Sequence, residues 1–527
     1  MRIENEKILL ISIDNPSAKV DIFIGFRKII VTFSVILRIY NYQFSIHPLE
    51  VQDLLKQYAA HPQVAALNTL LKNKTSRNIF LKGLNGSGAA MTIASLFSKR
   101  RGSYVCVLND LEDAGYFYHD LVQLTGGDGI YFFPSAYRRA IKYGHVDPAN
   151  EILRTEVLST LQDPTAPFII VTYPEALAEK VISREVLKEN TLKISVGERL
   201  DNMFVSDVLD EYGFEQVDYV YEPGQYAMRG SILDVFSFSY EFPYRIDFFG
   251  NEVETIRSFD VETQLSKEKL DSIYIVPEMT KGNRTNSSLL DSLPSETLLA
   301  SKDMAWVKER IGSIWNEEPI TGDEESFANI EQLRAKLITG EDFLHAALGF
   351  CRLHFGTRPT GIADATLTFS MEAQPIYHKN FDLVSESFHK YLEDGYTLYI
   401  LSDVEKQATR IRAIFEDRGD DIPFTSVNKT IHEGFADETL RVCLFTDHQL
   451  FDRFHKFNLK SDKARSGKLS LSLKELNQFT TGDYIVHIDH GVGQFGGLVR
   501  TEVNGKMQEA IRLIYQNNDI IFVSIHS

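Results

Sequence analysis

Short apolar runs separated by helix-like segments are the feature that most restricts the fold of this 527-residue chain. Asn78–Leu81, Tyr104–Leu108, Gly129–Phe133 and Phe168–Thr172 each read as a buried strand, and residues with helical spacing lie between them. Strands that alternate with helices in this way form a parallel sheet with helices on both faces. The sequence therefore predicts a doubly wound α/β domain in this region.

A glycine-rich turn follows the first of these runs. Gly83 to Ala90 have the glycine frame of a phosphate-binding loop. A working loop carries Lys and then Ser or Thr after its last glycine, Gly88, and this chain has Ala89 and Ala90 there. Backbone amides could still attract an anion, but we favour a strand-to-helix turn that keeps only the shape of such a loop. We expect neither hydrolysis nor a bound cofactor at this turn.

Length, charge and cysteine content limit the classes of protein to which the chain can belong. A chain of 527 residues exceeds what one hydrophobic core supports, so we expect several domains. The formal net charge of −18 argues against a general polyanion binder and suits either protein partners or plain solubility. Cys106, Cys351 and Cys443 are far apart, which predicts no disulfide framework or zinc site and favours a reducing cytoplasm. Charges interrupt the apolar stretch Ile22–Ile39, so we expect no membrane span.

Two alternating runs in the middle of the chain predict a binding surface. Ser231–Phe236 and Tyr244–Phe249 read as two strands of a half-buried sheet. In or beside them lie Arg229, Arg245, Asp247 and Phe249, which a simple core does not need. The alternative is local: Arg245 pairs with Asp247 or Glu252, and Phe249 belongs to the core, because Phe248 and Phe249 face opposite sides of a strand.

The last 58 residues predict a small all-β unit. Short alternating strands with glycine turns are expected at Tyr484–His487, Gly496–Arg500, Ala510–Tyr515 and Ile520–Ile525, and they favour a small β-barrel. His487, Asp489 and His490 raise a metal hypothesis, but without a fourth ligand a hydrogen-bonded pair explains them better. Tyr137, Arg138, Arg139, Lys142 and Tyr143 suit either single-stranded nucleic acid or, as we prefer, a solvated helix face.

Two segments resemble a known family. EPGQYAMRGSILDVF and FPYRIDFFGNEVETIRSFDVETQ, within residues 222–264, resemble a module shared by bacterial transcription-repair coupling factors and the B subunit of the excision nuclease. GDYIVHIDHGVGQFGGL, residues 482–498, resembles the RNA-polymerase-interacting domain of coupling factors, which the B subunit lacks. Two matches in the family's order identify the chain as the amino-terminal part of a coupling factor without its translocase motor.

The resemblance implies partners and residues. In the family the first module recruits the excision nuclease A subunit, and Arg229, Arg245 and Phe249 fall on positions that contact it. The terminal domain binds the RNA polymerase β subunit through a strand edge, which places Val499, Arg500, Thr501, Glu502 and Val503 as candidates. Coupling factors also carry a degenerate first ATPase module, and their working motor, which uses ATP and magnesium on double-stranded DNA, lies further along the chain.

The expected architecture is a multidomain α/β chain with a terminal β-barrel of the CarD or Tudor type. The expected segments are an unmatched extension (1–46), a degenerate ATPase-like α/β domain (47–190 and 278–377), the inserted α+β module (191–277), a small α/β domain (378–452), a flexible basic linker (453–470) and the barrel (471–527).

The function that follows is transcription-coupled nucleotide excision repair, in which the chain acts as an adaptor without catalysis of its own. Two alternatives remain at this point. One is an ATP-dependent repair enzyme like the B subunit, which Ala89, Ala90 and the terminal barrel disfavour. The other is a CarD-like transcription regulator, which would not need the recruiting module.

Overall fold

We analysed a computed structural model of the chain. It describes residues 49–136, 148–162, 165–238, 240, 242–261, 263–277, 285–316, 331, 334–455, 457, 459, 480–487, 491–503, 506–515 and 519–524. The expected extension at 1–46 and the basic aromatic segment Tyr137–Tyr143 lie outside these residues. Within them, no helix combines the length and the apolar character needed to cross a membrane.

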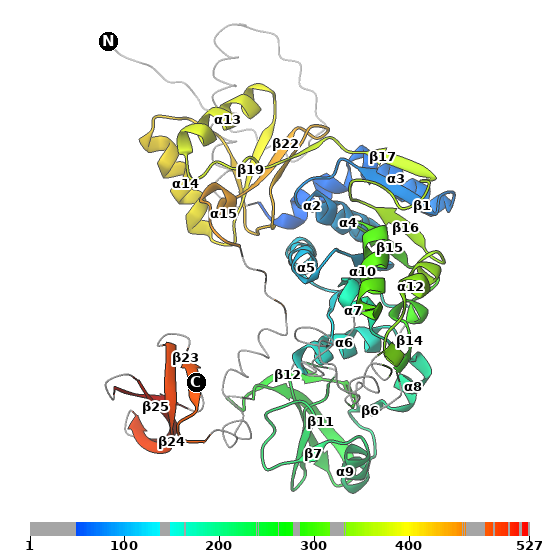
Figure 1. Ribbon diagram of the computed structural model, residues 1–527, viewed down its shortest axis with the longest axis vertical. Coiled ribbons are helices and arrows are strands. Elements are labelled where there is room, and N and C mark those ends of the chain that lie inside the picture. Colours follow the sequence, from blue (N-terminus) through cyan, green and yellow to red (C-terminus); the bar gives the residue numbers. More distant parts are fainter. Residues whose placement is uncertain are drawn as a thin grey trace, which may run out of the picture.

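A seven-stranded parallel sheet forms the centre of the first α/β unit (Figure 1). Its strand order is β17-β1-β16-β15-β2-β4-β3. The strands are β1 (Asn78–Lys82), β2 (Ser103–Val107), β3 (Ile130–Phe133), β4 (Phe168–Thr172), β15 (Leu298–Ser301), β16 (Cys351–His354) and β17 (Ala365–Thr368). The four predicted runs are therefore strands, and the central ones read as continuous apolar segments because both faces are covered.

Helices pack against this sheet. They are α2 (Val51–Ala59), α3 (Pro62–Asn73), α4 (Gly88–Lys99), α5 (Leu111–Thr125), α6 (Pro148–Thr160), α7 (Pro174–Ala178), α8 (Arg184–Glu189), α10 (Met304–Asn316) and α12 (Gly340–Ala347). Local sequence sets their ends: the Asp110 side chain caps the start of α5, and Gly126 ends it with a φ of 86°. Beside them, β5 (Val181–Ile182) pairs with β14 (Thr285–Ser287), and the short helix η2 (Leu289–Ser292) follows β14.

The chain leaves the seven-stranded sheet after β4 and returns to it with β15. The green strands β16 and β15 in Figure 1 consequently lie between the early strands β1 and β2, with β16 paired to β1 and β15 paired to β2. Between these points lies a second unit with its own core, which we call the interaction module. It holds a six-stranded sheet, a two-stranded sheet of β6 (Leu192–Ser195) with β13 (Ser272–Ile275), and helix α9 (Asn202–Glu211).

The six strands of the module run in the order β12-β11-β10-β9-β8-β7. They are β7 (Glu215–Gln216), β8 (Gln225–Arg229), β9 (Ile232–Val235), β10 (Tyr244–Phe249), β11 (Glu252–Phe259) and β12 (Ser266–Leu270). One face of this sheet packs on α9 through Val205 and Leu209, and the other carries the polar residues described below. The predicted strands at 231–236 and 244–249 correspond to β9 and β10.

A five-stranded mixed sheet forms a second α/β unit, with the order β18-β21-β22-β19-β20. Its strands are β18 (Met371–Ala373), β19 (Thr397–Leu401), β20 (Thr425–Val427), β21 (Phe435–Asp437) and β22 (Val442–Thr446), and its helices are α13 (Phe381–Glu393), α14 (Glu405–Asp417) and α15 (Asp447–Leu450). The unit begins before residue 378, the expected boundary, because β18 pairs with β21 as an edge strand. Phe435 and Leu444 of this sheet share one continuous core with the seven-stranded sheet.

The terminal unit is a four-stranded antiparallel sheet of β23 (Tyr484–His487), β24 (Gly491–Val503), β25 (Lys506–Ile514) and β26 (Ile520–Ser524) in sequence order. The sequence predicted a small β-barrel. Among the described residues, no pairing joins β23 to β26, so they form an open sheet. β24 is longer than predicted because a register shift between Phe495 and Leu498, at Gly497 with a φ of 97°, bends one strand instead of ending it.

Candidate interaction surfaces

Strand β10 directs the predicted binding residues of the module to one side of the sheet. Its core residues Tyr244, Ile246 and Phe248 alternate with Arg245 and Asp247 on the opposite side. Phe249 is 79% exposed, whereas Phe248 is 4% exposed. Phe249 therefore lies outside the core, and the alternative that buried it is wrong. We call this side of the sheet, with Arg229, Asp234, Arg245, Asp247 and Phe249, the outer face.

A buried carboxylate holds both predicted arginines. Asp234 is 1% exposed and lies directly opposite Arg245 in the β9–β10 register. Arg245 donates from Nε to Oδ1 at 2.7 Å and from Nη2 to Oδ2 at 2.8 Å. Arg229 donates to the same Oδ2 from the neighbouring strand β8. Because two cations converge on it, this carboxylate has the paired partners that a buried charge requires.

The expected local partners of Arg245 are therefore corrected. Asp247 instead accepts hydrogen bonds from Arg257 Nη2 at 2.5 Å and from Thr255 Oγ1 at 2.6 Å. The register explains the difference, because Asp247 lies opposite Thr255, whereas Arg245 has Asp234 as its neighbour on the other side. Hydrogen bonds to Asp234 raise the pKa of Arg245, against the opposing effect of burial.

The outer face combines positive charge with exposed aromatic rings. The register aligns Asp234, Arg245, Arg257 and Lys269 in one row across four strands, so three cations follow one carboxylate. The Arg229 guanidinium lies 5.0 Å from the centre of the Tyr219 ring, which is 55% exposed. Sequence reasoning missed Asp234, Arg257 and Tyr219. Asp234 stands at an alternate position of a predicted strand, and that spacing was the available signal.

The terminal sheet leaves part of β24 with one paired edge. β23 pairs with β24 over Gly491–Gln494, whereas Leu498–Val503 pair with β25 alone among the described residues. The predicted polymerase-binding residues Val499–Val503 belong to this segment. Their backbone is described, and side chains are described only as far as Val499.

One face of the same sheet carries exposed apolar side chains. Tyr484, Val486, Val492, Ile520 and Phe522 are between 48% and 74% exposed. The opposite face holds the small core of Phe495, Ile511 and Leu513. Contiguous apolar side chains on a small sheet are typical of a surface that contacts another protein.

The degenerate phosphate loop is an internal contact. Gly83 and Gly86 have φ values of 83° and 52°, which are left-handed backbone conformations that favour glycine. The Ser87 amide donates to the Glu433 carbonyl at 3.0 Å, and the Glu433 amide donates to Ser87 Oγ at 3.0 Å. The second α/β unit thus satisfies polar groups of the turn that an anion would use.

Histidines line the same contact between the two α/β units. The His432 ring stacks on Tyr116 with 3.5 Å between ring centres, and the His448 ring stacks on His455 at 4.4 Å. The His432 amide donates to Asp120 at 2.7 Å. Burial, followed by neighbouring histidines, lowers the pKa of His432 to about 4 and that of His455 to about 3. Burial also raises the pKa of Asp120 to about 7.

The start of the expected flexible linker is part of this contact. Tyr116 Oη donates to the His455 carbonyl at 2.7 Å, and Leu459 is 6% exposed. The described residues that follow α15 therefore pack on α5. Apolar residues at 457 and 459 explain why this part is not a solvated spacer.

No metal-binding cluster occurs among the described residues. Asp489 and His490 lie outside them, and so does the side chain of His487, so the metal hypothesis concerns a part of the chain without a description.

Comparison with known proteins defines the class of the chain first. A family model described as the UvrB interaction domain matches residues 192–280, and one described as the CarD-like/TRCF RID domain matches residues 479–527. The first match covers the interaction module and the second covers the terminal sheet. The chain is thus a multidomain α/β protein that carries one domain similar to each of these two family models.

Comparison with individual proteins shows which members of this class the chain resembles. The transcription-repair-coupling factors of Staphylococcus aureus and Bacillus subtilis are both 22% identical to the chain, over 85% and 84% of its length. The predicted resemblance to coupling factors is confirmed. The chain spans 44% of the length of these relatives.

Proposed function

We propose that the chain is an adaptor for transcription-coupled nucleotide excision repair. It binds the β subunit of stalled RNA polymerase through the terminal sheet and recruits the excision nuclease A subunit through the interaction module. The observation that carries this proposal is the presence of both domains in one chain, at 192–280 and 479–527. An ATP-driven translocase that acts on double-stranded DNA belongs to the proposed parent protein.

The outer face of the module suits a carboxylate-bearing protein surface. Arg229 keeps 35% of its side chain exposed while it pairs with Asp234. Phe249 contributes a large exposed ring on the same side. Arginine and aromatic side chains dominate the energetics of protein interfaces. These features support Arg229 and Phe249 as contacts, while Arg245, 16% exposed, acts mainly by fixing Asp234.

The β24 segment Leu498–Val503 supports the polymerase contact. A strand segment with one unpaired edge can accept another strand, which adds backbone hydrogen bonds without a special side-chain pattern. Strand addition depends little on the individual side chains of this segment, because the backbone supplies most of the affinity.

The phosphate loop supports an adaptor rather than an enzyme like the excinuclease B subunit. Ala89 and Ala90 supply neither the cation nor the hydroxyl of a working loop. The backbone of Glu433 already forms hydrogen bonds with the amide and the hydroxyl group of Ser87. We expect no ATP hydrolysis from this chain.

Pull-down with the purified A subunit and RNA polymerase tests the proposal. Phe249→Ala should abolish A-subunit binding and leave polymerase binding intact. Its matched control is Met203→Ala, because Met203 is 71% exposed on α9, which covers the other face of the sheet. Thr501→Pro on the open edge of β24 should abolish polymerase binding alone. Its control is Ser524→Pro on β26, the edge strand at the end of the same sheet.

Circular dichroism of each variant confirms that it is folded. Binding of both partners, with each loss confined to its own variant, supports the adaptor. Binding of polymerase alone would favour a CarD-like regulator, and binding of neither would refute the function.

A further inference from the structure

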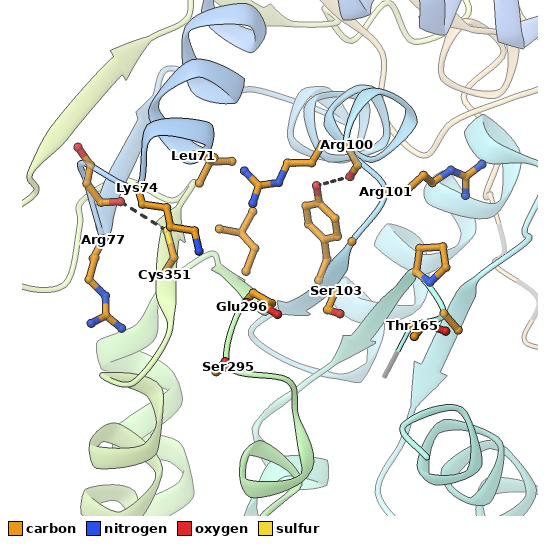
Figure 2. A pocket seen from close by; sticks show the side chains of 16 residues that line it. Leu71, Lys74, Arg77, Arg100, Arg101, Ser103, Thr165, Ser295, Glu296 and Cys351 are labelled. Carbon is orange, nitrogen blue, oxygen red and sulfur yellow. Dashed lines mark hydrogen bonds between the residues drawn. The ribbon is translucent and has the colours of Figure 1, made fainter. Parts of the chain in front are cut away.

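A cavity of about 650 Å³ opens at the amino-terminal ends of the parallel strands (Figure 2). Its walls include the starts of β2, β15 and β16 at Ser103, Leu298 and Cys351. The degenerate phosphate loop follows the carboxyl end of β1 and lies at the opposite edge of the sheet. The cavity is therefore a separate feature, and its size is that of a small-molecule site.

Basic side chains dominate the charged part of the lining. Lys74, Arg77, Arg100 and Arg101 line the cavity together with one carboxylate, Glu296. Among the described residues, none of these four cations lies within 4.0 Å of a carboxylate oxygen. In a chain of net charge −18, this concentration of cations is a local feature.

Two of the cations extend into a shared space. Figure 2 shows Lys74 and Arg100 reaching from opposite sides toward the middle of the hollow, with Glu296 below them, while the Arg101 side chain points away to the right. Arg77 is held at the outer edge, where its guanidinium donates to the Gly349 carbonyl. Two cations that approach each other without a carboxylate between them repel, and an anion would relieve that repulsion.

The pKa values of neighbouring ionisable groups reflect these positive charges. Burial raises the pKa of the Cys351 thiol, and the charges of Arg77, Arg100 and Arg352 oppose the rise. Burial and then Arg77 lower the pKa of Arg352. The positive field at this edge of the sheet is therefore only partly compensated within the protein.

The rest of the lining is apolar. Leu71, Tyr104 and Leu298 are buried residues at the base of the cavity, and Tyr104 Oη is fixed by donation to the Arg100 carbonyl at 2.8 Å. A ligand that fits both parts carries phosphate groups for the cations and a flat, weakly polar ring for the apolar base. We infer that this cavity binds a phosphorylated small molecule of nucleotide size, with Lys74 and Arg100 as its phosphate contacts.

A second explanation of the cations is that they offset helix dipoles. Helices α3 and α4 end at this edge, and cations at carboxyl ends stabilise helices. Lys72 and Lys99, in the last turns of the same helices, also serve that purpose and do not line the cavity. They provide a matched control, because their removal changes the helix ends without changing the cavity.

Isothermal titration calorimetry of the full chain with ATP, without magnesium, tests the inference. ATP should bind saturably, and inorganic tripolyphosphate should compete with it. Lys74→Ala combined with Arg100→Ala should weaken binding by at least about tenfold, because two charge-assisted contacts are lost. Lys72→Ala combined with Lys99→Ala should change it by less than about twofold.

Three results would overturn the inference. They are no saturable binding of ATP, equal weakening by both pairs of substitutions, or binding of a single-stranded oligonucleotide at this site in preference to ATP. Thermal unfolding of both double variants tests the helix-dipole explanation. If the variants lose stability and the unaltered chain does not bind ATP, the cations serve only to stabilise the helix ends.

Discussion

At the scale of single residues, Asp234 is the group on which the outer face of the interaction module depends. It is 1% exposed, and its two oxygens accept from Arg229 and Arg245. Removing one arginine leaves the other as a partner, whereas removing the carboxylate leaves two cations facing each other. The binding roles proposed for Arg229 and Arg245 therefore depend on the same contacts that stabilise the sheet.

Asp234→Ala should lower the free energy of unfolding by about 2 kcal/mol, because it leaves both guanidinium groups without their buried carboxylate partner. Asp247→Ala is the control on the same face. Asp247 is 21% exposed, and its loss should cost less than about 1 kcal/mol. Urea unfolding measures both, and an equal cost for the two variants would contradict this ranking.

Phe248 and Phe249 form a second matched pair. Phe248→Ala should cost about 3–5 kcal/mol because it empties a position in the module core. Phe249→Ala should change the unfolding free energy by less than about 0.5 kcal/mol, because its ring lies in solvent. Denaturant titration distinguishes them, and a large cost at Phe249 would mean that its ring is packed.

At the scale of elements, the phosphate-loop turn has become a contact between two α/β units. A Cβ added at Gly86 would meet the Gly434 carbonyl oxygen at 2.7 Å and that of Glu433 at 3.0 Å. The close approach of backbone, more than the turn itself, therefore demands glycine here. This explains why the glycine frame is present although the catalytic residues are not.

Gly86→Ala should destabilise the chain by about 1–3 kcal/mol more than Gly395→Ala. Gly395 also has a positive φ, of 81°, but nothing lies within 4 Å of an added Cβ, so its substitution reports only the backbone strain. Thermal unfolding compares the variants, and limited proteolysis should show the second α/β unit released only by Gly86→Ala. Equal costs would mean that the contact is loose.

At the scale of the whole molecule, we expect the histidine-lined contact to make the association of the two α/β units depend on pH. His119, His432, His448 and His455 all have lowered pKa values, mainly through burial. The charged groups that act on them are Asp113, Asp403, Asp447, Lys429 and Arg453. Since the folded state resists protonation of these rings and the unfolded state does not, acid favours unfolding.

Stability should therefore fall as the pH drops from about 6.5, the unfolded value, toward about 4. Asp120 acts in the opposite direction, because its raised pKa of about 7 makes the folded state take up a proton in that window. Four histidines outweigh one carboxyl group. His432→Phe should flatten the pH dependence of the thermal midpoint, whereas His345→Gln, in the last turn of α12, should leave it unchanged. A pH-independent midpoint for the unaltered chain would refute this role.

The sequence by itself determined the elements and the relationship of the chain. Apolar runs of fixed length predicted the strands at 78–81, 104–108, 129–133 and 168–172, because a strand covered on both faces is mostly apolar. Motifs at 222–264 and 482–498 identified the coupling-factor resemblance, because the residues that make up each motif stand close together along the chain.

Only the tertiary structure decided which distant groups meet. The pairing of Arg245 with Asp234 follows from strand register, and a shift of one residue would have reversed the faces of β10. The contact between Ser87 and Glu433 joins positions 346 residues apart, and the cavity takes its four cations from the ends of two helices and the strands beside them. Local sequence sets the conformation of each segment, but the packing of separate segments sets the surfaces. That packing cannot be predicted from residues that are close together in the sequence.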